Sequence, residues 1–229
     1  MNSKPDHDDR DHGAGTPTAE TDAELGASLA VREYFGTHYD AVARFHDRLR
    51  AEGELRGLIG PREVSRLWER HILNSAALVP FVEGAGSVAD VGSGAGLPGV
   101  VVAIMLPDAE VTLIEPMERR TTWLAEIADE LALENVTIRR GRAEEFHGSV
   151  EVDVVTSRAV AALAKLARMS LPLVRSGGDM VVLKGRNVAQ EVDPARKVLR
   201  SFGASEPEIL DGRTVGDVEG TTVVRIHRA

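Results

Sequence analysis

Short apolar runs alternate with helix-length amphipathic stretches from Ser87 onward, and this alternation constrains the fold more than any other feature of the sequence. The runs are rich in valine and isoleucine, which is typical of buried strands. The expected strands are 87–91, 111–115, 136–139, 152–157 and 180–184, and the expected helices are 97–106, 117–133, 160–174 and 188–202. Strands separated by helices pair in parallel through right-handed crossovers, with helices on both faces of the sheet. The pattern therefore predicts an α/β fold, a three-layer sandwich.

Two further strand-like runs close the chain, at 208–210 and 222–226. The segment between them holds several glycines and no helical pattern, so we expect an antiparallel C-terminal hairpin. Together with the five earlier strands, this predicts a mostly parallel seven-stranded sheet.

The N-terminal part of the chain has a different pattern. In 25–86, apolar residues recur at helical intervals, as in Tyr39, Val42, Phe45 and Leu49, so we expect a helical extension before the α/β domain of 87–229. Residues 1–24 carry seven acidic and two basic residues and almost no apolar side chains. Such a segment cannot bury enough surface to offset its ordering entropy, so we expect a disordered acidic tail.

A glycine-rich loop follows the first expected strand, and two cofactor motifs fit it. Gly94, Gly96 and Gly99 match the dinucleotide fingerprint G-x-G-x-x-G, and Glu115 ends the next strand where a ribose-binding carboxylate would stand. The same loop contains D-x-G-x-G-x-G, the first motif of methyltransferases that use S-adenosylmethionine, and Glu115 would again bind the ribose. The second motif consists of Asp90, Gly92, Gly94 and Gly96.

The charge of Asp90 favours the second interpretation. A carboxylate just before the first glycine would repel the pyrophosphate of NAD, whereas it would attract the ammonium and sulfonium groups of S-adenosylmethionine. The sequence thus indicates a methyltransferase, with an NAD-binding oxidoreductase as an alternative.

Basic residues follow three of the expected strands. Because the carboxyl ends of parallel strands meet at one edge of the sheet, we expect a local basic rim there, suited to a substrate that carries phosphate. These residues are Arg142, Arg158, Lys184 and Arg186. The loop 140–146 belongs to the same edge, where backbone amides and Glu144 could meet an adenine ring.

Composition excludes several other classes. The formal net charge is -9, so the protein does not attract nucleic acid through an overall positive charge. The absence of cysteine excludes disulfides and thiolate metal sites, and we expect no metal site, reading His7 and His12 as solvated. The longest apolar run, 100–106, is too short to span a bilayer, so we expect a cytoplasmic protein without a membrane partner.

Three segments give the sequence a close resemblance to a known family. They are Leu-Trp-Glu-Arg-His-Ile-Leu-Asn-Ser at 67–75, Asp-Val-Gly-Ser-Gly-Ala-Gly-Leu-Pro-Gly at 90–99 and Ser-Arg-Ala at 157–159. With them the chain resembles the bacterial small-subunit ribosomal RNA methyltransferase G family over about residues 30–229. The resemblance implies a Rossmann-like class I methyltransferase that transfers a methyl group from S-adenosylmethionine to N7 of one guanine in the decoding-region loop of 16S RNA. It implies 16S rRNA or the 30S subunit as partner, and we expect a monomer.

The resemblance also assigns residues to the cofactor. It places the contacts on Gly92, Leu97, Ala143, Glu144 and Arg158, with Glu115 on the ribose. Asn74 is a departure, since many members of the family have Asp there, and a charged role at this position is therefore in doubt.

The chemistry of N7 limits what the protein must provide. This nitrogen has an exposed in-plane lone pair and no proton to lose, so we name no catalytic base and expect Arg142, Arg158 and Lys184 to position the substrate. His71 is expected to make a structural hydrogen bond to a strand end, and Trp68 and Trp123 to lie in the core. A small-molecule methyltransferase or a nonenzymatic cofactor-binding module would share the cofactor residues, and both remain alternatives.

Overall fold

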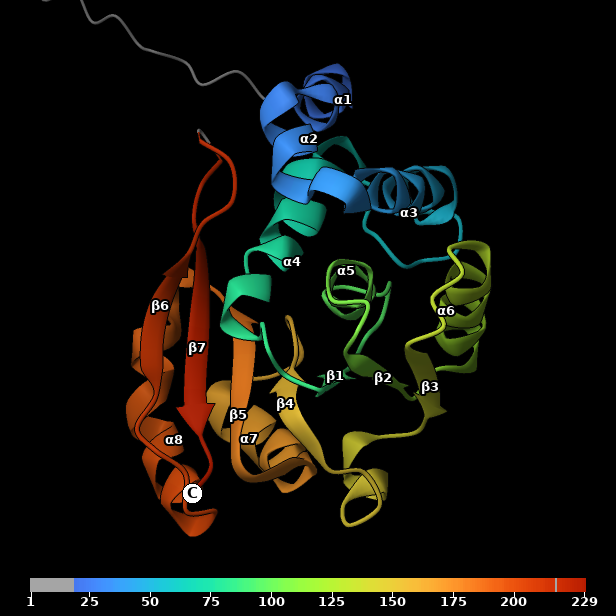
Figure 1. Ribbon diagram of the computed structural model, residues 1–229. Coiled ribbons are helices and arrows are strands. Elements are labelled where there is room, and N and C mark those ends of the chain that lie inside the picture. The colour runs from blue at the N-terminus through green and yellow to red at the C-terminus, as the bar shows by residue number, and fades with distance from the viewer. Residues whose placement is uncertain (1–18, 217) are drawn as a thin grey trace, which may run out of the picture.

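The computed structural model describes residues 19–216 and 218–229 and contains a seven-stranded sheet of order β3-β2-β1-β4-β5-β7-β6 (Figure 1). The first five strands pair in parallel, and β7 is antiparallel to both β5 and β6, so the predicted sheet and hairpin are confirmed. The strands are β1 Ser87–Val91, β2 Glu110–Glu115, β3 Val136–Arg140, β4 Val152–Thr156, β5 Val174–Lys184, β6 Glu208–Gly212 and β7 Thr221–His227.

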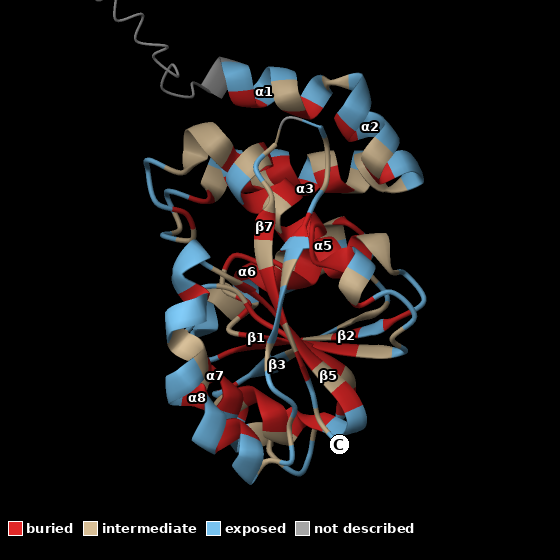
Figure 2. Ribbon diagram, turned by 90° about the vertical axis from the view of Figure 1, so that its left-hand side faces the viewer, coloured by how far each residue is buried: buried red, intermediate tan, exposed pale blue. Residues whose placement is uncertain are grey.

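Helices cover both faces of this sheet (Figures 1 and 2). Alternate strand residues face opposite layers: Val88 packs into the hydrophobic cluster that contains α5, and its neighbour Ala89 packs into the one that contains α7 and α8. Because both faces are buried, the strands can be apolar along their length. The helices of the two layers are α5 Gly99–Met105 and α6 Glu118–Glu130 on one side, and α7 Leu163–Ser170 and α8 Ala189–Ser201 on the other.

The predicted end of one helix and the predicted start of the next strand are wrong. The helix expected over 160–174 ends at Ser170, a 3₁₀ turn follows over Leu171–Leu173, and β5 begins at Val174 rather than at 180. The register with β4 shifts between Val152 and Val154, whose partners are Val174 and Asp179. The early part of β5 therefore bulges out of the ladder, and its Ser-Gly-Gly sequence carries no apolar pattern that could have revealed it.

The N-terminal extension packs on the α5 and α6 side (Figure 2). Trp68 is buried and stacks on Tyr39 and His46, and Trp123 is buried and donates its indole N–H to the Ala95 carbonyl at 3.0 Å. Both tryptophans thus lie in the core, as predicted. The extension comprises α1 Ala19–Ala27, α2 Leu29–Phe35, α3 Tyr39–Glu52, the 3₁₀ turns η1 Gly36–His38 and η2 Val64–Arg66, the π-helical turn η3 Trp68–Leu73, α4 Asn74–Ala76 and the 3₁₀ turn η4 Val79–Phe81.

The acidic segment that we expected to be disordered, 1–24, is predicted too long at its C-terminal end. Its residues 1–18, including His7 and His12, lie outside the described residues, but 19–24 belong to α1. Asp22 is 6% exposed, and its carboxylate accepts hydrogen bonds from the backbone N–H groups of Trp68, at 3.0 Å, and Glu69. The charge that suggested a solvated residue instead caps the unpaired amides at the start of η3.

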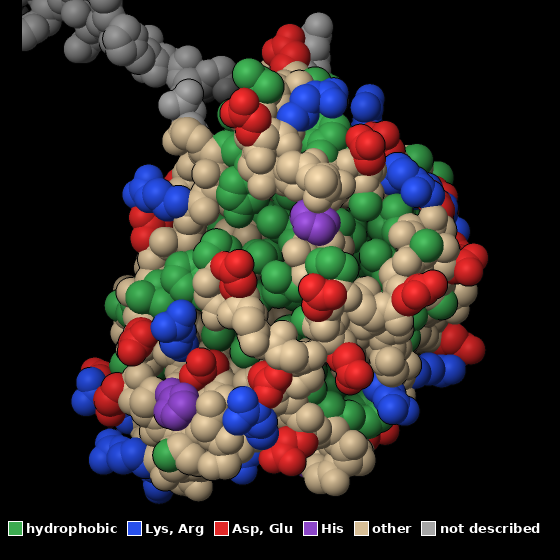
Figure 3. Space-filling view, in the orientation of Figure 1, with side chains coloured by type: hydrophobic (Ala, Val, Ile, Leu, Met, Phe, Trp, Pro, Cys, Tyr) green, Lys and Arg blue, Asp and Glu red, His purple; other side chains and the backbone are tan. Residues whose placement is uncertain are grey.

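Acidic and basic side chains are interspersed on the face shown in Figure 3, with hydrophobic side chains between them. Charges of one sign do not gather there into a continuous field. On this face, an attraction for a polyanion would have to come from a local group of residues.

We expect Asp22→Ala to lower the free energy of unfolding by about 1–3 kcal/mol, because it leaves buried amides without an acceptor. Glu24→Ala is the matched control, since Glu24 is an exposed acid of the same helix and should change stability by less than about 0.5 kcal/mol. Urea unfolding of both variants measures the difference. Equal stabilities of the two variants would contradict a stabilising role for the hydrogen bonds that Asp22 accepts.

Candidate functional site

A cavity of about 430 Å³ opens at the carboxyl ends of β1, β2 and β3, where open α/β sheets bind their ligands. Five of the predicted site residues line it: Gly92, Glu115, Arg142, Ala143 and Glu144. Further lining residues come from segments that the sequence analysis did not assign to a site, namely Met117, Arg120, Val160, Lys165 and Met169. Nothing in the local pattern of these residues signals a site, because only the fold brings their helices and loops to this edge.

Glu115 ends β2 on the wall of this cavity and holds the glycine loop. Its side chain is 2% exposed; one carboxylate oxygen accepts from the Gly94 N–H and the other from the Met117 N–H, both at 2.9 Å. Arg120 lies 3.7 Å from the first oxygen. The carboxylate is thus fixed by backbone donors on both sides, which pre-organises it toward a ligand in the cavity.

Gly92 forms the turn between β1 and the loop. Its φ is 75°, and an added Cβ would lie 2.6 Å from Cγ2 of Val160, which packs directly against it and also lines the cavity. Only glycine fits this conformation and this contact without strain. The loop therefore keeps its backbone close to whatever the cavity holds.

Asp90 lies beneath the loop rather than in the cavity wall. It is fully buried, and one oxygen accepts from the N–H of Gly99 at the start of α5, at 3.0 Å. The other oxygen has no partner among the residues that the structure describes. Burial raises the pKa of this carboxyl to about 7.

The remaining loop residues assigned to the cofactor also lie away from the cavity lining. These are Gly94, Gly96 and the buried Leu97. Their contacts with the cofactor stay a prediction. In the structure they form part of the loop between β1 and α5 without lining the cavity.

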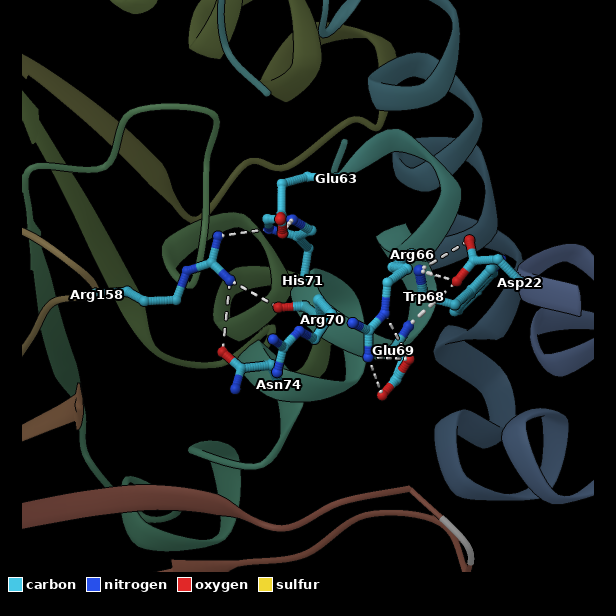
Figure 4. Close-up of polar contacts among 9 residues, drawn as sticks. All are labelled: Asp22, Glu63, Arg66, Trp68, Glu69, Arg70, His71, Asn74 and Arg158. Carbon is cyan, nitrogen blue, oxygen red and sulfur yellow. Dashed lines mark hydrogen bonds and ion pairs between the residues drawn. The ribbon is translucent and has the colours of Figure 1, made fainter. Parts of the chain in front are cut away.

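A second cavity of about 360 Å³ lies beside the first, beyond the ends of β4 and β5, and Ala159 lines both. Its walls come from the N-terminal extension on one side and from the sheet edge on the other (Figure 4). The lining comprises Glu63, Arg70, His71, Asn74, Arg158, Ala159, Leu183, Lys184 and Gly185.

Arg158 joins these two walls. From the end of β4 its guanidinium donates to Nδ1 of His71 at 2.8 Å, to the Arg70 carbonyl at 3.1 Å and to the Asn74 side chain at 3.4 Å (Figure 4). Burial lowers the pKa of Arg158 to about 10, which still leaves it charged at neutral pH. Arg158 thus lies outside the lining of the first cavity, and its predicted cofactor contact stays a prediction.

His71 makes the predicted hydrogen bond to a strand end, since its partner Arg158 follows β4. Burial first, and the nearby Arg158 second, lower the pKa of His71 to about 4, so the ring is neutral at pH 7. Because an arginine can only donate, Nδ1 accepts, and the ring proton is on Nε2. That nitrogen donates to the Glu63 carboxylate at 3.1 Å.

The predicted basic rim is divided. Arg142 and Arg186 are exposed, and Arg186 pairs with Glu219 at 3.1 Å. Lys184 turns inward: its ammonium pairs with Glu191 at 2.7 Å and donates to the Ala161 carbonyl at 2.9 Å. A role of Lys184 in holding a substrate stays a prediction, and its ammonium would have to leave these partners.

Among the described residues, no helix has the length and hydropathy needed to cross a bilayer. The same residues contain no group of three or more histidine or acidic side chains arranged to hold a metal ion.

Comparison with known proteins gives consistent similarities. The family model described as rRNA small subunit methyltransferase G matches residues 38–212. The chain is 51% identical over 198 residues to the ribosomal RNA small subunit methyltransferase G of Beutenbergia cavernae, covering 86% of this chain and 93% of that protein. It is 49% identical to the protein of the same name from Pseudarthrobacter chlorophenolicus, covering 90% and 94%.

Solved structures share the fold at low sequence identity. A putative O-methyltransferase from Klebsiella pneumoniae superposes with a TM-score of 0.53 at 17% identity, covering 80% of this chain and 89% of that chain. Precorrin-6y C5,15-methyltransferase from Geobacter metallireducens gives 0.53 at 13% identity, covering 75% and 91%. The fold is therefore that of class I methyltransferases.

We expect Asp90→Asn to change how stability depends on pH. The folded pKa of about 7 lies above the unfolded value of 3.8, so the native state keeps a proton that the unfolded chain releases. The resulting stabilisation is complete below the unfolded pKa and is lost as pH rises through 7. Between pH 5 and pH 8, urea unfolding should show the wild type losing on the order of 2 kcal/mol relative to Asp90→Asn. If the free energies of unfolding of the two proteins changed with pH in parallel, the raised pKa of Asp90 would be contradicted.

Proposed function

The chain belongs to the rRNA small subunit methyltransferase G family, and on this premise we propose that it methylates N7 of a single guanine in the decoding-region loop of 16S ribosomal RNA, with S-adenosylmethionine as methyl donor. The observation that carries the proposal is the pair of adjoining cavities at the strand ends, one suited to the cofactor and one to a base.

The first cavity fits S-adenosylmethionine. Its volume is in the range of small-molecule sites, its glycine turn admits close approach, and its buried Glu115 carboxylate suits ribose hydroxyls. Ala143 and Glu144 line the side expected to meet the adenine ring, with Arg142 at the rim. When bound, S-adenosylmethionine supplies a methyl group carried on a sulfonium sulfur.

The protein's part in the reaction is orientation. Guanine N7 needs no base, so no residue has to remove a proton, and alignment of the base for in-line attack can contribute about 7–11 kcal/mol. A base stacked in a duplex cannot reach a buried methyl group, so the substrate is a looped-out guanine entering the second cavity. The exposed Arg70 and Arg186 lie where they can contact flanking phosphates.

Family membership decides among the alternatives that the sequence left open. It favours S-adenosylmethionine over NAD, and RNA over a small-molecule substrate. We propose that the protein acts as a monomer in the cytoplasm, on 16S rRNA or on the assembled 30S subunit.

Incubation with tritiated S-adenosylmethionine and 30S subunits lacking the modification should label 16S RNA. Borohydride and aniline cleavage should then map the label to N7 of one guanine in the decoding-region loop. Free 16S RNA, total protein and a metabolite extract serve as parallel substrates. Label in protein or metabolites alone would contradict the proposed function.

Glu115→Gln should weaken binding of S-adenosylmethionine by about 1.5–3 kcal/mol, since a charged acceptor for the ribose is lost. It should also lower stability by about 1–2 kcal/mol, because an amide NH₂ cannot accept from the Gly94 or Met117 N–H. Calorimetric titration and thermal unfolding measure the two effects. Glu118→Gln, an exposed acid at the start of α6, is the control. Unchanged affinity would assign the ribose contact to another residue.

A further inference from the structure

The second cavity must receive the target base in a defined orientation, an expectation that rests on the proposed function. Ala159 lines both cavities, so a base in the second cavity has one edge toward the cofactor cavity. If that edge carries N7, the opposite edge of a guanine, with N1–H and the N2 amino group, points away from the cofactor. The residues on the wall of the N-terminal extension then decide which base is accepted.

Glu63 is the only carboxylate among the described residues that line this cavity. It stands at the start of the segment that leads through η2 into η3, with its side chain 47% exposed. Two of the lining cations already have partners within the protein. Arg158 donates to groups on η3 and α4, and Lys184 pairs with Glu191. The wall therefore offers a base one well-placed anionic acceptor.

A chain of hydrogen bonds fixes the direction of this carboxylate. Arg158 donates to Nδ1 of His71, which forces the ring proton onto Nε2, and Nε2–H donates to one oxygen of Glu63 (Figure 4). The end of β4 thereby positions a residue of the N-terminal extension, because Arg158 and His71 lie 87 residues apart in the sequence and Glu63 follows His71 in the relay. The second oxygen of Glu63 has no hydrogen-bond partner among the described residues and remains available to a ligand.

Guanine alone among the four RNA bases presents two neighbouring donors on its Watson–Crick edge, N1–H and N2–H. Adenine and cytosine place a donor beside an acceptor, and uracil places one donor between two acceptors. A carboxylate can accept both guanine donors, whereas the other bases would leave an acceptor facing its negative charge. The same chemistry would let a protein reject adenine, which also has a nucleophilic N7.

We propose that Glu63 is the specificity-determining residue of this site: it accepts hydrogen bonds from N1–H and N2–H of the target guanine and is held in place by the relay from Arg158 through His71. The proposal assigns a direct contact with the substrate to Glu63. Arg158 and His71 are positioning residues that act through it.

The test compares guanine with hypoxanthine, which keeps N7 and N1–H and lacks the N2 amino group. We would prepare 16S RNA by splinted ligation with guanosine or inosine at the mapped position and reconstitute it into 30S subunits. Wild-type protein should favour guanosine in kcat/KM by about 10- to 100-fold, the effect of losing one hydrogen bond to a charged group. Glu63→Gln should lose activity on guanosine by a similar factor, and its preference should fall below about 3-fold.

Glu54→Gln is the control, because it removes the same charge from an exposed position outside both cavities. It should keep both the rate and the preference of the wild type, and all three proteins should bind S-adenosylmethionine equally. The guanosine-to-inosine ratio is taken within each protein, so partial unfolding of a variant cancels.

The outcomes separate the two proposals. A wild-type protein that methylates neither substrate contradicts the proposed function. An active wild type with equal rates on guanosine and inosine, or an active Glu63→Gln with the wild-type preference, overturns the assignment of Glu63 and leaves the proposed function intact.

Discussion

The half-buried guanidinium of Arg158 is the contact that joins the walls of the second cavity. It leaves the sheet at the end of β4 and satisfies acceptors on η3 and α4, so it ties the N-terminal extension to the sheet edge. A charge taken out of water is stable only with several well-placed partners, so this contact is costly to break. The wall that carries Glu63 and His71 is thereby held against the edge where the cofactor cavity opens.

The two acidic residues of the cofactor motif act first on the backbone. Asp90 accepts from the first amide of α5, and Glu115 accepts from the glycine loop and from the residue that precedes α6. In the structure both side chains shape the glycine loop through these backbone contacts. Pre-organised donors and acceptors of this kind lower the cost of binding, because little has to be ordered when the ligand enters.

A protein with a net charge of -9 must attract RNA locally. The two strand-end cations expected to face the substrate together are instead used inside the protein: Arg158 holds the extension, and Lys184 pairs with Glu191. The exposed Arg70, Arg142 and Arg186 remain at the rim. The basic residues that hold the site in place are thus different from those that can bind phosphate. This arrangement suits a reaction that relies on orientation rather than on proton transfer.

The sequence by itself determined the sheet, the glycine loop at the end of β1, the burial of both tryptophans and the hydrogen bond of His71 to a strand end. These features follow from periodicity, turn chemistry and side-chain size. Such properties act over a few neighbouring residues, so they can be predicted from the sequence. Only the tertiary structure decided that Asp22 caps η3, that β5 begins in a bulge at Val174, that Asp90 lies beneath its loop and that Lys184 turns inward. The direction of a charged side chain depends on which partner reaches it, and Arg158 finds its partners 84 to 88 residues away in the sequence. No local pattern records such a partner, because it is packing that brings the two segments together.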